Sequence, residues 1–227
     1  MYKKLFIASL VANVLLIAGA IWAGVGLIHV AHTFTRIAGE RWRTQFEFLT
    51  ESKHGAVFLG DSITEGGHWS ELFRSAEVLN RGIGGDTTQD VLDRVEQIYA
   101  LQPARLFLMI GVNDLNQGIA TQTTLANYRA LFDGFTRNLP KTRVFVQSVL
   151  PVNAQWRMGA ANNPDINRLN EFLRTESTAR GYTFVDLHEQ FSDRSGALRA
   201  ELSNDGIHLL GAGYKLWRAT VQPLVSE

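Results

Sequence analysis

Ala56-Val57-Phe58-Leu59-Gly60-Asp61-Ser62 begins as an uninterrupted apolar run and ends in a glycine-bounded turn that carries a serine. A short apolar run bounded by turn residues is typical of a strand buried inside a sheet. A serine directly after such a strand is most often a turn or helix-capping residue, because its hydroxyl can bond nearby backbone groups. The same hydroxyl can also be a nucleophile, and the rest of the chain decides between the two interpretations.

Apolar, strand-like runs alternate with segments of helical periodicity along the rest of the chain. Besides residues 56–59, strands are predicted over residues 77–80, 105–110, 143–149 and 182–185, and helices over residues 89–99, 125–135, 165–180 and 211–221. Strands and helices that alternate in this way form a parallel sheet with helices on both faces. The sequence therefore predicts an α/β fold.

Polar or glycine-rich residues follow three of the predicted strands. Ser62 follows the first strand, the glycine-rich residues 82–87 follow the second, and Gly-Val-Asn-Asp at residues 111–114 follows the third. Ligands of parallel sheets bind beyond the carboxyl ends of the strands. These three loops are therefore expected to open on one edge and to share one pocket.

A candidate base and acid for Ser62 lie far along the chain, in Asp205-Gly206-Ile207-His208. A serine hydroxyl is a weak nucleophile and needs a neighbouring base. The imidazole of His208 can accept a proton and later return it, and Asp205 can hold the other ring nitrogen. In isolation, His208 is equally well a turn histidine, and Asp205 an Asx-turn or capping residue.

A tetrahedral intermediate of acyl transfer also needs hydrogen-bond donors for its oxyanion. Gly85 can present its backbone amide without a side chain in the way, and Asn113 can add a side-chain amide. The alternatives are an ordinary tight turn for the glycines and a left-handed loop residue for Asn113. Asp61 is expected to brace the serine turn by accepting backbone hydrogen bonds.

Four short blocks carry a family resemblance. In chain order, Gly60-Asp61-Ser62-Ile63, Gly82-Ile83-Gly84-Gly85-Asp86-Thr87, Gly111-Val112-Asn113-Asp114 and Asp205-Gly206-Ile207-His208 resemble the signature blocks of the SGNH hydrolases, also called GDSL-type lipases and esterases. The resemblance covers about residues 55–220. Ile63 replaces the leucine of the name-giving motif, which is a conservative apolar change. The second block looks most like the platelet-activating-factor acetylhydrolase-like branch.

The resemblance implies a flavodoxin-like three-layer α/β/α sandwich with a five-stranded parallel sheet, in a domain of residues 55–227. It implies a catalytic triad of Ser62, Asp205 and His208, and an oxyanion hole made by the amides of Ser62 and Gly85 and the side chain of Asn113. The branch and its bacterial relatives act on short acyl groups, often acetyl. The expected activity is that of a serine esterase that forms an acyl-enzyme on a short-chain ester of a carbohydrate or another small polar molecule.

Two other functions stay open at this point. A lysophospholipase or lipase working at a bilayer is one, and a non-catalytic binding module on a hydrolase fold is the other, because a fold does not guarantee a function. Residues 152–163 are expected to shape the pocket, with Trp156, Arg157 and Met158 as candidate lining residues. The alternative is that these residues pack the loop.

Composition narrows the possible partners. The 227 residues include 22 basic and 22 acidic side chains and no cysteine. No basic stripe is present, which argues against a nucleic-acid partner. The absence of cysteine excludes disulfides and thiolate metal sites. No phosphate-binding Gly-Lys-Ser/Thr loop and no His-Glu-x-x-His occur, so no cofactor and no metal are expected. The oligomeric state is left open.

The N-terminus resembles a membrane signal. Residues 5–30 are almost entirely apolar and follow Lys3 and Lys4, and about 20 such residues can cross a bilayer as a helix. We expect a transmembrane signal anchor over residues 1–31 and an amphipathic juxtamembrane helix over residues 32–54, with the catalytic domain exported to the periplasmic or extracellular face. A cleaved, secreted form is the alternative to the anchor. The helix over residues 32–54 is expected to be a spacer that docks on the domain, and a role at the membrane surface is its alternative. Phe34, Ile37, Phe46 and Leu49 are expected to share its apolar face.

Overall fold

The computed structural model of the protein describes residues 2–50, 55–155 and 159–226. Its sheet consists of β1(Ala56–Gly60), β2(Val78–Gly82), β3(Arg105–Met109), β4(Arg143–Gln147) and β5(Thr183–Val185). All neighbouring strands are parallel, and their order is β2-β1-β3-β4-β5. This is the flavodoxin-like strand order. The predicted α/β fold with a five-stranded parallel sheet is confirmed.

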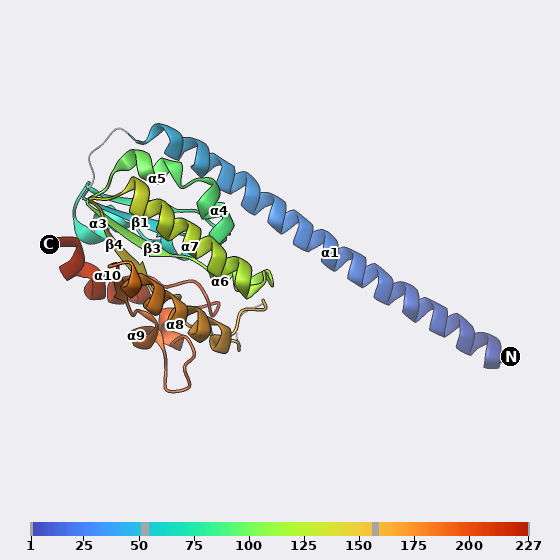
Figure 1. Cartoon of the computed structure of the whole chain (residues 1–227). Helices are drawn as coiled ribbons and strands as arrows, with labels where there is room; N and C mark the ends of the chain where they lie inside the picture. The colour runs from blue at the N-terminus through green and yellow to red at the C-terminus, as the bar shows by residue number, and fades with distance from the viewer. Residues whose placement is uncertain (1, 51–54, 156–158, 227) are drawn as a thin grey trace. The chain divides into compact units, whose positions relative to one another are not determined.

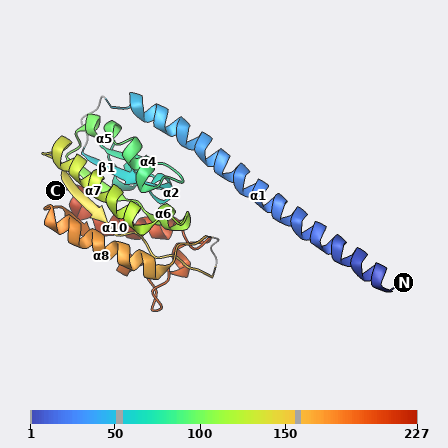
Figure 2. The same ribbon diagram turned by 45° about the vertical axis from the view of Figure 1, so that its right-hand side comes forward.

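Helices cover both faces of the sheet (Figures 1 and 2). They are α2(Ser62–Glu65), α3(Trp69–Phe73), α4(Thr88–Asp93), α5(Glu96–Leu101), α6(Val112–Asn116), α7(Thr121–Asn138), α8(Asn163–Ala179), α9(His188–Phe191), a 3-10 turn at Ala200–Leu202, and α10(Gly211–Ser226). On one side α4 packs against α7 and α7 against α8, while α3 packs against α10 on the other. The domain is thus built in three layers.

A row of aromatic rings forms the core on the α3 and α10 side. Phe58 pairs in register with Phe107, and Phe107 with Phe145, so the three rings lie on one face of the sheet. Ring centroids are 4.6 Å apart in both pairs. Trp69 of α3 stacks on Phe58 at 4.1 Å, and Trp217 of α10 meets Trp69 edge-on at 4.8 Å. The aromatic row therefore fixes α3 and α10 against the three central strands.

The predicted helix over residues 89–99 is wrong in one respect, because it is two helices. α4 ends at Asp93 and α5 begins at Glu96. The break lies at Arg94, whose buried guanidinium donates hydrogen bonds to the carbonyls of Gly60 and Arg81. A continuous amphipathic helix would place only apolar side chains toward the sheet. Here the guanidinium of Arg94 points toward the ends of β1 and β2.

The second strand also differs from its prediction over residues 77–80. β2 runs over Val78–Gly82 and includes Asn80 and Arg81. Because the second half of β2 is polar, the strand does not form a continuous apolar run in the sequence. Both polar side chains have structural partners, which are described below.

The N-terminal segment forms one continuous helix, α1(Tyr2–Phe48), across the two segments predicted for it. No proline occurs before Pro103, so nothing in the sequence forces a break. Among the described residues, the structure contains no helix that is long and apolar enough to cross a membrane. The predicted transmembrane anchor is therefore not supported. Contacts group the chain into two units, Met1–Glu40 and Arg41–Glu227.

The predicted apolar face of residues 32–54 is only partly present. Phe46 is buried, whereas Ile37 and Leu49 are exposed. The side chain of Phe34 and all of residues 51–54 lie outside the described part of the chain. Phe46 is the residue of this face that packs on the domain, and its surroundings are considered in the last Results subsection.

Candidate active site

Ser62 stands at the start of α2, directly beyond the carboxyl end of β1. Asp61 caps this short helix, and its Oδ1 accepts a hydrogen bond of 3.0 Å from the amide of Ile63. Asp61 therefore braces the serine turn, as predicted. Its carboxyl is buried, and this burial raises the pKa of Asp61 to about 7 against the opposing effect of the Ile63 amide.

The short helix α2 is held by contacts from two distant elements. The side-chain amide of Asn80 in β2 donates to the carbonyls of Thr64, Glu65 and Gly67, at 3.1, 2.9 and 2.9 Å. The hydroxyl of Tyr214 in α10 donates to the carbonyl of Ile63 at 2.8 Å. A helix of one turn has almost no stability of its own, so these bonds hold the Ser62 turn in place.

Two glycines allow α2 to lie this close to the strand ends. A Cβ added to Gly82 would lie 2.2 Å from the amide nitrogen of Glu65 in α2, and one added to Gly60 would lie 2.3 Å from Oγ1 of Thr64 in α2. Both distances are shorter than van der Waals contact. Gly60 also pairs in register with Gly82 and with Met109. The loops that follow β1, β2 and β3 therefore begin side by side.

Ser62, His208 and Asp205 form one chain of hydrogen bonds. The Oγ of Ser62 lies 2.9 Å from Nε2 of His208. Nδ1 of His208 lies 2.6 Å from Oδ2 of Asp205. The structure thus brings together the three residues that the sequence predicted for catalysis. Each is partly accessible to solvent, so a substrate can reach the hydroxyl.

The Asp205 carboxylate is fixed on its other oxygen as well. Its Oδ1 accepts hydrogen bonds from the amides of Ile207 and His208, at 2.9 and 2.8 Å. Partial burial acts to raise the pKa of Asp205, but the hydrogen bond with the His208 side chain and those two amides outweigh it and lower this pKa to about 2. Asp205 is therefore ionised at neutral pH and faces the imidazole as an anion.

The lowered pKa of Asp205 predicts a pH-dependent contribution to stability. A carboxyl whose folded-state pKa of about 2 lies below its ordinary value of 3.8 stabilises the fold above pH 3.8, and this contribution is lost as the pH falls toward 2. Urea unfolding followed by circular dichroism should show a gap in midpoint between the wild type and Asp205→Asn at pH 6. The gap should narrow between about pH 4 and pH 2. A gap that stays constant over that range contradicts the prediction.

The second predicted loop lies beside Ser62. Gly85 has φ +82°, a left-handed conformation that favours glycine. A Cβ added to Gly84 would lie 3.9 Å from the Cβ of Ser62. The side-chain amide of Asn113, from the third loop, donates to the carbonyl of Asp86 at 2.9 Å. We refer to residues 83–87 as the Gly85 loop; the structure places this loop next to both Ser62 and Asn113.

Two buried clusters under this loop were not predicted from the sequence. In the first, Asp114 accepts hydrogen bonds from the Thr88 amide at 2.9 Å and from the hydroxyls of Thr88 and Thr124. Burial raises the pKa of Asp114, against the effect of these donors. Asn127 adds a bond to the Thr88 hydroxyl. This cluster joins the start of α4 to α6 and α7, and it fixes the end of the Gly85 loop.

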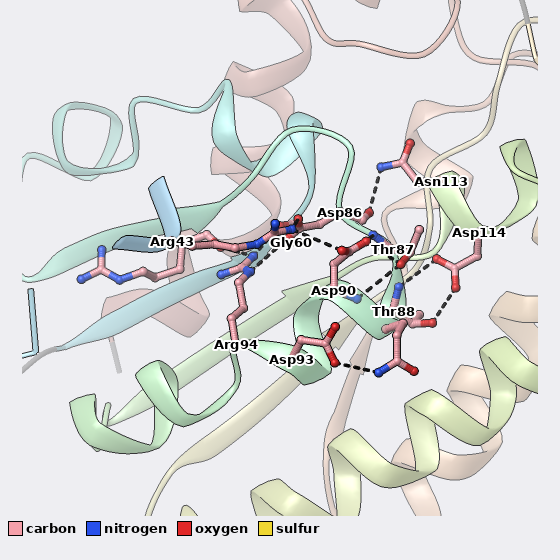
Figure 3. Close-up of polar contacts among 12 residues, drawn as sticks. Arg43, Gly60, Asp86, Thr87, Thr88, Asp90, Asp93, Arg94, Asn113 and Asp114 are labelled. Carbon is pink, nitrogen blue, oxygen red and sulfur yellow. Dashed lines mark hydrogen bonds and ion pairs between the residues drawn. The ribbon is translucent and has the colours of Figure 1, made fainter. Parts of the chain in front are cut away.

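The second cluster is the ion pair of Arg94 and Asp86 (Figure 3). Nε of Arg94 lies 2.7 Å from Oδ2 of Asp86, and both side chains are buried. The same guanidinium binds the carbonyls of Gly60 and Arg81, at 3.1 and 2.9 Å. A signal for this cluster exists in the sequence, because Arg94 interrupts the apolar stripe of the predicted helix over residues 89–99.

The segment expected to shape the pocket is described only in part. Trp156, Arg157 and Met158 lie outside the described residues. Hydrogen bonds join the two ends of this segment. The side chain of Asn163 accepts from the amide of Val152 at 2.8 Å and donates to its carbonyl at 2.9 Å. A hollow lined by residues such as Phe73, Glu77 and Arg105 lies where the strands begin, and shares no residue with the site.

The sequence and the fold have counterparts among known proteins. A family model described as GDSL-like Lipase/Acylhydrolase family matches residues 58–216. The platelet-activating factor acetylhydrolase IB subunit alpha1 of Bos taurus is 30% identical over 188 residues, which cover 77% of this chain and 78% of the relative. A solved Streptococcus pneumonia structure has a TM-score of 0.81 and 26% identity, covering 87% of this chain and 97% of that one. A GDSL-like lipase of Bacteroides thetaiotaomicron has a TM-score of 0.71 and 26% identity, covering 82% and 96%.

A hydroxyl, an imidazole and a carboxylate in hydrogen-bonded order, at the carboxyl edge of a parallel sheet, define the serine hydrolase class of site. The chain belongs to the GDSL-like lipase/acylhydrolase family, as its sequence blocks predicted. It is a carboxylic ester hydrolase.

Proposed function

We propose that this protein is a serine esterase that removes short acyl groups, acetyl above all, from a small polar ester. The observation that carries the proposal is the continuous chain of hydrogen bonds from Ser62 through His208 to Asp205, at 2.9 and 2.6 Å. Family membership supports ester hydrolysis in general. The roles of individual residues and the choice of acyl group are our inferences.

In the proposed reaction, Oγ of Ser62 attacks the carbonyl carbon of the ester while Nε2 of His208 takes the hydroxyl proton. Asp205 holds Nδ1 of His208 and stabilises the imidazolium that forms. The tetrahedral intermediate then collapses, the C–O bond to the alcohol breaks, and His208 returns its proton to the leaving oxygen. Water attacks the acyl-enzyme by the same steps in reverse, releasing the acid and restoring Ser62.

The developing oxyanion would be held by the amides of Ser62 and Gly85 and the side chain of Asn113. The Ser62 amide lies at the N-terminus of α2, and Gly85 presents its amide from a left-handed turn. Asn113 has two amide hydrogens, so the one it gives to Asp86 leaves the other for a substrate. The bond to Asp86 also fixes the orientation of this side chain before a substrate binds.

The preference for a short acyl group rests on the relatives. The mammalian relatives are named as subunits of platelet-activating factor acetylhydrolase IB, and the alpha1 subunit of Bos taurus is 30% identical to this chain. For this protein we infer the acetyl preference alone, together with a polar acyl acceptor such as an acetylated sugar.

A panel of p-nitrophenyl esters from acetate to palmitate, with acetylated sugars alongside, tests this preference. We expect kcat/KM to be highest for acetate and to fall by at least about tenfold toward long chains, because a pocket shaped for a methyl group excludes longer ones. The Ser62→Ala protein serves as the blank for every substrate. A kcat/KM that climbs from acetate to palmitate would reject the acetylesterase proposal in favour of a lipase or lysophospholipase.

A further inference from the structure

The last turns of α1 pack on the domain beside the Gly85 loop. Phe46 is 4% exposed, and the guanidinium of Arg81 lies over its ring at 4.5 Å. The carbonyl of Leu49 accepts a hydrogen bond of 2.9 Å from Arg81, and the carbonyl of Arg43 accepts one of 3.0 Å from the side chain of Gln97. The residues from Arg41 onward thus belong to the same compact unit as the sheet.

Within this segment, Arg43 reaches two acidic residues, Asp86 and Asp90, which stand on either side of residues 87–89 in the sequence. Its Nη2 lies 2.6 Å from Oδ1 of Asp86 and 3.3 Å from Oδ1 of Asp90 (Figure 3). Asp86 is 1% exposed on its side chain. Its other oxygen is bound by Arg94, so Asp86 lies between two guanidinium groups. Of these two arginines, Arg43 is the more exposed, at 33% of its side chain against 2% for Arg94.

Both acidic residues control the backbone of the Gly85 loop. Asp86 directly follows Gly85, and its carbonyl accepts the side-chain amide of Asn113. Asp90 accepts hydrogen bonds from the amide and hydroxyl of Thr87, at 2.9 and 2.7 Å. The bond from the Thr87 amide, together with the bond of 3.3 Å that the Asp90 amide donates to the Thr87 hydroxyl, forms the capping box of α4. One guanidinium therefore joins the side chains of Asp86, whose backbone carbonyl accepts Asn113, and of Asp90, which binds Thr87 at the end of the Gly85 loop.

We infer that Arg43 is a positioning residue for the proposed oxyanion hole: the N-terminal helix holds the Gly85 loop and Asn113 in place through the Arg43–Asp86–Asp90 bridge. This inference rests on the proposed function. Arg43 does not touch the site itself. Its effect reaches the reaction through Asp86, and a shift of the donors by a fraction of an ångström is enough to weaken transition-state binding.

Replacing Arg43 with alanine should lower kcat for p-nitrophenyl acetate about tenfold and leave KM nearly unchanged, because oxyanion donors act mainly in the transition state. Arg43→Lys should recover part of the loss, since an ammonium can bind one carboxylate but cannot bridge both. The fold should persist, because Asp86 keeps Arg94 as its partner. A circular dichroism melt checks this.

Two matched variants separate positioning from simple helix docking. Arg41→Ala removes an exposed arginine two residues away and should leave kcat unchanged. Gln97→Ala removes the bond to the backbone of Arg43 but leaves the bridge intact, so kcat should also stay close to the wild-type value. If Gln97→Ala lowers kcat as far as Arg43→Ala does, the helix contact as a whole matters, and the role assigned to the guanidinium is overturned.

Amide hydrogen exchange gives a readout that does not depend on activity. Exchange of residues 83–87 should speed up in Arg43→Ala and stay unchanged in Arg41→Ala. Unchanged exchange in Arg43→Ala overturns the inference, and so does faster exchange with an unchanged kcat. If the wild type hydrolyses none of the esters, the proposed function fails. The exchange data still show whether Arg43 holds the loop.

Discussion

Replacing Ser62 with alanine is expected to reduce turnover of p-nitrophenyl acetate to the uncatalysed background, a loss of about 10⁴- to 10⁶-fold in kcat. The change removes the hydroxyl that lies 2.9 Å from Nε2 of His208. The other members of the triad then have no nucleophile to activate. Because the partner imidazole is exposed to solvent, the substitution leaves no buried polar group without a hydrogen bond, and the fold should remain intact.

Ser70→Ala is the matched control for this experiment. Ser70 is an exposed serine in α3, so the same chemical change is made outside the site. A fluorophosphonate probe should label the wild type and Ser70→Ala and fail to label Ser62→Ala. A folded Ser62→Ala protein that keeps more than a tenth of the wild-type rate would show that another residue is the nucleophile.

Asp205→Asn is expected to lower kcat by about 10⁴-fold, the size of the effect when the aspartate of a Ser-His-Asp triad becomes asparagine. The expected cause is the wrong tautomer of His208. Oδ1 of Asp205 accepts two backbone amides, so the carbonyl oxygen of an asparagine must take that place. Its NH₂ group, which is a donor, then faces Nδ1 of His208. This ring nitrogen must therefore act as the hydrogen-bond acceptor and carry no proton. The ring proton moves to Nε2, where it blocks the base that Ser62 needs.

Asp193→Asn provides the matched control for the triad aspartate. The carboxylate of Asp193 accepts the amides of Ser195 and Ala197 in an exposed turn, in the way Asp205 accepts its own amides. This control should keep the wild-type kcat. If Asp205→Asn stays folded and its kcat falls by less than tenfold, the tautomer argument fails. Asp205 would then stabilise the turn and would not orient His208.

Much of the fold could be predicted because the strand signals are local. The sequences of β1, β3 and β4 are almost purely apolar, and nearly all of their residues are buried, as expected for central strands of a covered sheet. β2 was less clear because Asn80 and Arg81 face backbone carbonyls that belong to other elements. The predicted helix over residues 89–99 failed at Arg94 for a similar reason, since the Gly60 carbonyl that its guanidinium binds lies 34 residues earlier in the sequence.

The grouping of Ser62, His208 and Asp205 could be predicted because these residues sit in short blocks with a recognisable order, and the structure brings them within hydrogen-bonding distance. The supporting residues could not be predicted in this way. Tyr214 bonds the Ile63 carbonyl, and Arg43 bonds Asp86, yet nothing near either residue in the sequence indicates a partner so far along the chain. Such pairings are decided by tertiary packing alone.

The contact between Tyr214 and the Ser62 turn has a consequence for how the enzyme becomes active. Ser62, the proposed nucleophile, lies just after β1. His208, the proposed base, and Tyr214, which bonds the helix of Ser62, come from the last part of the chain, 146 and 151 residues away from their partners. Contacts of such long sequence separation form late, because the loop between them must close first. A chain halted after β5 would hold every strand of the sheet and still lack His208, the proposed base. Recovery of ester hydrolysis during refolding therefore reports the arrival of the C-terminal segment, and not the assembly of the sheet.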